Sequence, residues 1–180
     1  MRGGDLRRVL KQGTAHIHHR LDEAVGSLGG HDSYRIFVQN SYRFRQSVEP
    51  ALANATVWMT PPLLALLEQD LDDLGADRVK SGQRPVELVN PSAQIGALYV
   101  LEGSALGAQL LYRRAQALGY HGRFGARHLA RQTQGTGRWG AFLTLMGTLG
   151  ELDPDLVLSS AQKVFGHALA AFEEASCERI

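Results

Sequence analysis

The sequence has a single cysteine, Cys177, among its 180 residues. One cysteine excludes an internal disulfide framework and any zinc or iron–sulfur site built from several cysteines. Lysine is also scarce, with three residues against sixteen arginines. The nineteen basic residues are balanced by eighteen acidic ones, and the net charge of +1 gives no reason to expect nucleic acid or an anionic membrane as a partner.

Long apolar runs are missing as well. No stretch approaches the roughly 18 residues that a membrane span needs, and the first residues, MRGGDLRRVLKQG, are too polar for a signal peptide. We therefore expect a cytoplasmic protein. Alternating strand patterns of useful length are lacking too, so the sequence predicts an all-α fold in which residues 1–180 form one domain, a helical bundle.

Helical spacing of apolar residues, with glycine and proline as stops, indicates where the helices lie. We expect helices over 5–26, 34–53 (capped by Ser33), 61–75, 90–119, 138–152 and 155–176, and a loop with one short helical piece over 120–137. In the second of these the apolar residues predict a buried stripe of Tyr34, Phe37, Val38, Tyr42, Val48 and Leu52.

The helix expected over 90–119 carries three glycines in its interior, Gly96, Gly103 and Gly107. At about 100° per residue they fall within a stripe roughly 40° wide. Each costs on the order of 1 kcal/mol relative to alanine, so the stripe indicates that something approaches the backbone closely. Close packing of a second helix and a bulky flat ligand explain the glycines equally well.

The first helix contains the histidine cluster HIHH. With Leu10 as reference, the helical spacing puts His18 on the same face as Thr14 and Leu21, whereas His16 and His19 point elsewhere. A histidine on an apolar face is more often a core residue than a ligand. Asp22, one turn later, can orient the imidazole, and Lys11, two turns earlier, supplies a cation on the same face.

An inward histidine with a cation at one end, opposed to a helix that lacks side chains, suits a planar metallocycle with carboxylates at one edge. Haem fits this description, because histidine coordinates iron and basic groups bind propionates.

The sequence resembles a known family, the haem oxygenases, and most closely those of bacteria that supply biliverdin to phytochromes. The segment TAHIHHRLD (14–22) is similar to the family's proximal helix, and LYVLEGSALGAQLL (98–111) to its distal helix. The segments YRIFVQNSYRFRQSVEPAL, RWGAFL and QKVFGHALAAFEE resemble further helices of the family, so the similarity spans nearly the whole chain.

The resemblance implies a haem-oxygenase-like bundle with haem between the proximal and distal helices, and it implies the site residues. His18 is the metal ligand, and the catalytic positions are Gly103, Ser104 and Gly107. The residues implied to bind the cofactor are Lys11, Thr14, His18, Asp22, Tyr99, Gly103, Gly107 and Arg138. The chain departs from the family pattern at Ser104, where many members have an aspartate, and at Ala108, where a second glycine is common.

The implied reaction is oxidative cleavage of haem, as cofactor and substrate, to biliverdin, carbon monoxide and iron, with O2 as co-substrate. Oxygen would bind on the glycine side, and water ordered near Ser104 would supply the proton. Electrons would come from a partner reductase or ferredoxin, because the chain has no dinucleotide fingerprint. A bacteriophytochrome apoprotein is the implied acceptor of biliverdin.

Two other classes compete with this interpretation. A non-catalytic haem carrier or sensor would keep His18, Lys11 and the glycines but would not turn over, and Ser104 is the residue that most favours it. An iron–carboxylate bundle would need Glu-x-x-His pairs, and none of the seven histidines has a glutamate three residues before it.

Overall fold

The computed structural model describes residues 3–53, 55, 57–135 and 137–177, with the side chain of Cys177 outside the described part. The elements are α1 (Gly3–Val25), α2 (His31–Val48), the 3-10 helix η1 (Glu49–Leu52), α3 (Leu64–Asp73), α4 (Pro91–Ala117), α5 (Arg127–Thr133), α6 (Arg138–Thr148) and α7 (Pro154–Cys177). The described residues contain no β-strand beyond isolated bridges of His121, so the all-α prediction is confirmed.

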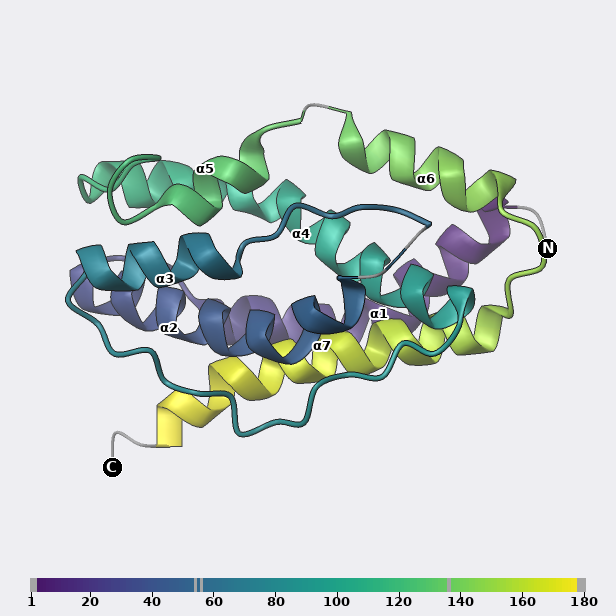
Figure 1. Ribbon diagram of the computed structural model, residues 1–180, viewed down its shortest axis with the longest axis horizontal. Coiled ribbons are helices and arrows are strands. Elements are labelled where there is room, and N and C mark those ends of the chain that lie inside the picture. Colours follow the sequence, from purple (N-terminus) through teal and green to yellow (C-terminus); the bar gives the residue numbers. More distant parts are fainter. Residues whose placement is uncertain (1–2, 54, 56, 136, 178–180) are drawn as a thin grey trace.

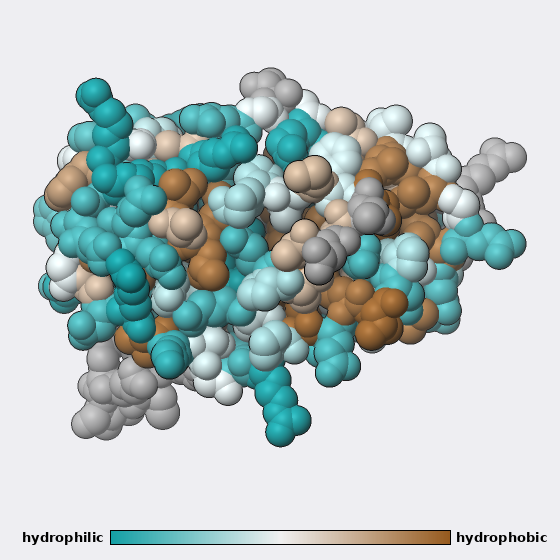
Figure 2. All heavy atoms as spheres, viewed as in Figure 1, coloured by the Kyte–Doolittle hydropathy of each residue, from teal (hydrophilic) through white to brown (hydrophobic). Residues whose placement is uncertain are grey.

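The long helix α7 organises the others. Helices α1, α2 and α4 all pack along it, while α3 covers α2 and α5 covers α4 (Figure 1). Helix α6 bridges α1 and α4 at the end of the molecule where α7 begins. Hydrophilic residues cover most of the face drawn in Figure 2 over α2, α3 and α5, and hydrophobic residues gather toward the α6 end.

The glycine-rich helix α4 begins and ends as its sequence predicts. The side chain of Asn90 caps it by accepting a hydrogen bond from the amide of Ala93 at 2.8 Å, and Pro91 occupies the first helical position. Gly119 follows the end of the helix with φ at +89°, a conformation that glycine adopts without strain.

Helix α2 differs from the expected 34–53. It begins at His31 after Gly30, and Ser33, expected as the cap, lies inside the first turn and exchanges hydrogen bonds with the Gly30 backbone. Pro50 cannot continue the α-helical ladder, so the chain tightens into η1 after Val48. The predicted buried stripe is confirmed, since all six of its residues are buried.

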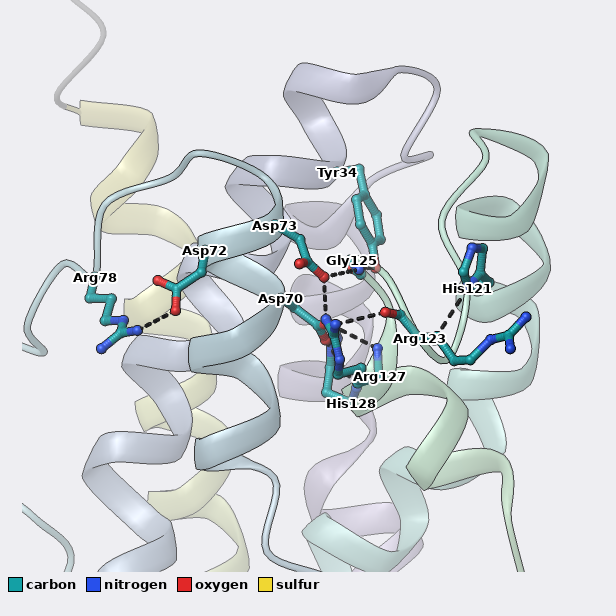
Figure 3. A network of polar contacts seen from close by, with 10 residues as sticks. All are labelled: Tyr34, Asp70, Asp72, Asp73, Arg78, His121, Arg123, Gly125, Arg127 and His128. Atoms are coloured by element: carbon teal, nitrogen blue, oxygen red, sulfur yellow. Dashed lines mark hydrogen bonds and ion pairs between the residues drawn. The ribbon is translucent and has the colours of Figure 1, made fainter.

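A cluster of buried polar side chains connects α5 to α3 through hydrogen bonds and ion pairs (Figure 3). Asp70 of α3 is fully buried and accepts hydrogen bonds from the amides of Arg127 and His128, while its Oδ2 lies 2.7 Å from Nδ1 of His128. Asp73 accepts from the amide of Gly125 and pairs with the Arg127 guanidinium. These carboxylates cap the first turn of α5 and hold the short helix beside α4.

Candidate functional site

Helix α1 lies against α7 at close range. Gly13 permits the approach, because a Cβ atom there would come within 2.6 Å of the Leu158 side chain, and Gln162 donates a hydrogen bond to the Gly13 carbonyl at 2.9 Å. One turn later the His18 ring meets Phe165 of α7 edge-on, with the ring centroids 5.5 Å apart. The α1–α7 contact therefore fixes the position of His18.

The His18 side chain remains accessible, with 58% of its surface exposed. Its Nδ1 lies 3.0 Å from Oδ2 of Asp22, one turn later. This carboxylate favours the imidazole tautomer that carries its proton on Nδ1, and leaves the lone pair on Nε2 for a metal ion. His19 pairs more loosely with Glu23, at 3.5 Å, and is more exposed.

The middle of α4 presents an open apolar face, which we define as Gly103, Leu106, Gly107 and Leu110. Leu106 and Leu110 are 58% and 52% exposed. A Cβ atom at Gly107 would meet no other atom within 4 Å, and one at Gly103 would meet only the rim of Trp139, at 3.7 Å. Backbone and leucine side chains thus form a flat surface with space in front of it.

The open face of α4 looks toward the His18 face of α1. Tyr99 lies one turn before Gly103, and the charge of Arg7 on α1 acts on it: burial raises the pKa of Tyr99 and Arg7 opposes the rise. Arg7 precedes His18 by eleven residues, which at about 100° per residue places the two only about 20° apart around α1. The two faces therefore lie on the sides of α1 and α4 that carry Arg7 and Tyr99.

The far ends of the two helices also meet on these faces. Arg114, seven residues after Gly107 on α4, donates a hydrogen bond at 3.3 Å to the carbonyl of Gly26, which directly follows α1. Between these two junctions α1 presents His18 and α4 presents glycines. An accessible imidazole and a helix backbone without side chains thus oppose each other. This arrangement fits a flat ligand whose iron is coordinated by the histidine.

The glycine stripe has two roles rather than one. A Cβ atom at Gly96 would lie 2.2 Å from the Val157 carbonyl oxygen and 2.9 Å from the Ala161 amide nitrogen, so Gly96 allows α4 to touch α7. Of the two explanations that the sequence left open, close packing of a second helix therefore applies to Gly96. Gly103 and Gly107 lie beyond the contact with α7.

The predicted site residues Lys11, Thr14 and Ser104 differ in their burial and in their hydrogen bonds. Lys11 is exposed on the His18 face of α1. Thr14 is buried, and its hydroxyl donates to the Leu10 carbonyl at 2.8 Å, so it supports α1 from within the core. The Ser104 hydroxyl donates to the Leu101 carbonyl at 2.7 Å and accepts from Gln132 of α5 at 3.2 Å.

Arg138 lies at the start of α6, and its hydrogen bonds go to Glu102 and Met59. Its guanidinium makes two hydrogen bonds to the buried carboxylate of Glu102, at 2.7 and 3.1 Å, and a third to the Met59 carbonyl. Binding a propionate would require it to leave Glu102. Its role in haem binding remains a prediction, and its contacts assign it to the junction of α4 and α6.

Sequence reasoning missed three residues of this site: Arg7, Trp139 and Phe165. Trp139 packs against Tyr99 with 5.4 Å between ring centroids and lies over Gly103. It stands beside Arg138 in RWGAFL, and Phe165 lies in QKVFGHALAAFEE, two segments that resembled the family. The spacing of Arg7, one turn before Lys11, was also a usable signal.

Known proteins similar to this chain include haem oxygenases. No family model matches the chain. The haem oxygenase PigA of Pseudomonas aeruginosa is 33% identical over 166 residues, which cover 84% of this chain and 83% of PigA. The crystal structure of the NO- and CO-bound haem oxygenase from Neisseria meningitidis superposes with a TM-score of 0.78 at 27% identity, covering 94% of this chain and 90% of that one.

The likeness to PigA extends over most of both chains, and the Neisseria enzyme shares the fold. This chain belongs to the haem oxygenase family. Among the described residues, no helix is long and apolar enough to cross a membrane.

Proposed function

We propose that this haem oxygenase holds its substrate between the His18 face of α1 and the open face of α4, with Nε2 of His18 as the iron ligand. The chain cleaves haem to biliverdin, carbon monoxide and iron, with O2 as co-substrate. The observation that supports the proposed site is the opposition of an accessible imidazole, oriented by Asp22, to the bare backbone at Gly103 and Gly107.

Bound haem supplies the iron that activates O2, and the protein's residues act around it. Asp22 keeps the Nδ1 proton of His18 in place, which raises the basicity of the coordinating nitrogen. Lys11 and Arg7 supply positive charge for the propionates at the end of α1 where Tyr99 and Trp139 meet. Thr14 supports α1 from within the core, behind His18.

On the opposite side, Gly103 and Gly107 leave room for a small gas molecule. The Neisseria relative holds NO and CO, and a diatomic ligand on this side suits the open α4 face. The Ser104 hydroxyl, held by Leu101 and Gln132, orders the water that delivers the proton. A hydroxyl does so without the charge of the carboxylate that many family members have there.

Three finer points belong to the same proposal. The chain acts in the cytoplasm as one domain over residues 1–180. Electrons come from an external reductase or ferredoxin. The biliverdin serves a bacteriophytochrome apoprotein, as the resemblance to the phytochrome-linked branch implies.

The test combines binding with turnover. Haemin is titrated into wild-type protein and into His18→Ala and His19→Ala variants, the Soret band is recorded, and reductant is added under air while biliverdin absorption is followed. Wild type and His19→Ala should show a histidine-ligated Soret band and form biliverdin. His18→Ala should lose both while retaining its helical circular dichroism, because its side chain is more than half exposed. Normal turnover by His18→Ala would refute the proposed site.

A further inference from the structure

Arg45 on α2 is a buried cation with few partners. Its side chain is 6% exposed, and Nη1 of its guanidinium is buried without a hydrogen-bond partner. The nearest carboxylate, Glu49, lies 3.7 Å from Nη1, and its oxygens already accept hydrogen bonds from the amides of Leu63 and Leu64. A buried charged donor without an acceptor is unfavourable in a protein interior, so an additional acceptor is expected beside Arg45.

A cavity of about 130 Å³ lies next to Arg45 and adjoins the open face of α4, with which it shares Leu106. Its walls come from α2, the segment before α3, α4, α5 and the start of α6, and include Arg45, Glu102, Gln109, Gln132, Gly137 and Trp139. The volume is several times that needed for one water molecule, and the lining combines polar side chains with apolar ones. The cavity can therefore hold a small polar group together with water.

The start of α6 also points to a negative occupant. Gly137 is the N-cap of this 11-residue helix and has no side chain with which to cap it. Gly137 and Trp139 both line the cavity. The uncapped amides of a helix N-terminus carry partial positive charge and bind anions.

The charges around the cavity limit the occupant. Glu102 lines it, but its carboxylate is neutralised by Arg138 and accepts a further hydrogen bond from Nε1 of Trp58 at 2.9 Å. Burial lowers the pKa of Arg45, and the charges of Glu49 and Glu102 oppose this shift. With two carboxylates already nearby, a singly charged anion is favoured over a multiply charged one.

We propose that this cavity binds a small, singly charged, planar oxyanion of the bicarbonate, nitrate or formate class. The planar fork of the Arg45 guanidinium matches two coplanar oxygens, and the first turn of α6 supplies amide donors. Gln132 lines the same cavity and donates to the Ser104 hydroxyl at 3.2 Å. The oxyanion site thus adjoins the open face of α4 at Leu106 and is connected to Ser104 through Gln132.

The experiment uses haem-free protein and nitrate, with ionic strength held constant by exchanging chloride. Backbone ¹H–¹⁵N signals of the first turn of α6 should shift along a saturable curve, while those in the middle of α7 stay constant. Arg45→Met keeps the volume of the side chain and removes its charge, and it should weaken nitrate binding at least tenfold.

Two further variants test whether nitrate binds in the cavity. Ala105→Leu fills the cavity from the α4 wall and should abolish the nitrate shifts even if Arg45→Met folds poorly. Arg78→Met removes an exposed arginine paired with Asp72 and should bind nitrate as wild type does. A response no different from that to chloride, or saturable binding that persists in Ala105→Leu, would overturn the proposal and leave the cavity to water.

Discussion

Nδ1 of His18 lies 3.0 Å from Oδ2 of Asp22, one turn further along α1. The next histidine makes a parallel pair, with His19 Nε2 3.5 Å from the Glu23 carboxylate. The two pairs share a helix and a spacing, and His18 is the less exposed of the two histidines. They form a matched set for testing which of the two positions binds iron.

We predict that Asp22→Ala weakens haem binding about tenfold, at the lower end of the effect of losing a carboxylate behind a metal-binding histidine, because the pair is exposed. The iron–histidine stretching frequency of the ferrous haem complex, measured by resonance Raman, should fall as the imidazole loses its acceptor. Glu23→Ala is the control and should change neither quantity, and Asp22→Asn should restore part of the loss. Equal effects of Asp22→Ala and Glu23→Ala would contradict an orienting role.

Gly96 and Gly107 predict opposite results for the same substitution. Gly96→Ala places a Cβ atom against the Val157 carbonyl and should destabilise the fold by about 1–3 kcal/mol or more, because α4 and α7 must separate. Gly107→Ala should leave stability unchanged within about 1 kcal/mol or raise it slightly through helix propensity. Urea unfolding of the haem-free variants measures both.

Gly107→Leu extends this comparison to function. The leucine would occupy the space in front of α4, so haem affinity or CO binding to the ferrous complex should fall sharply while the haem-free fold persists. CO binding by flash photolysis and haemin titration are the measurements. A destabilised variant whose folded fraction still makes biliverdin normally would show that Gly107 serves packing alone.

Lys11→Glu should change the orientation of haem more than its affinity. Lys11 is exposed, and exposed ion pairs are weak, but a small energy difference is enough to bias two in-plane orientations. We expect an altered ratio of biliverdin isomers by chromatography. Lys163→Glu, on the exposed side of α7, is the control. Identical isomers from Lys11→Glu and wild type would place the propionates elsewhere.

The α3–α5 cluster predicts a pH-dependent stability. Burial raises the pKa of Asp70, but the hydrogen bonds and charge of His128, with the Arg127 amide, outweigh burial and bring it below its usual value. A carboxyl with a lowered folded-state pKa stabilises the fold above its unfolded value, near pH 4, and loses this contribution as the pH falls through the folded value.

Asp70→Asn should therefore cost on the order of 3 kcal/mol at pH 7, since it removes one partner of a buried charged cluster. The difference from wild type should shrink below about pH 4. Asp72→Asn, in an exposed pair with Arg78, is the control and should have little effect at either pH. Urea unfolding at pH 7 and in the acid range measures the difference, and a pH-independent cost would argue against the charge of Asp70.

Local sequence patterns determined the helices. Helix α4 begins at Asn90 and Pro91 and ends before Gly119, because capping and left-handed turns depend on nearest neighbours. The order of α1 and α4, the buried stripe of α2, and the position of His18 on one face with Asp22 also followed from helical spacing. The segments around His18 and Gly103 were enough to indicate the family.

The tertiary structure decided what each face meets. Gly96 and Gly103 lie about 20° apart around one helix, yet the first packs on α7 and the second lies beside the ring of Trp139 on α6. Arg138 pairs with the buried Glu102, and Arg45 borders a cavity built from five segments. Periodicity gives the direction of a side chain from its own helix axis, whereas its partners depend on the packing of distant segments.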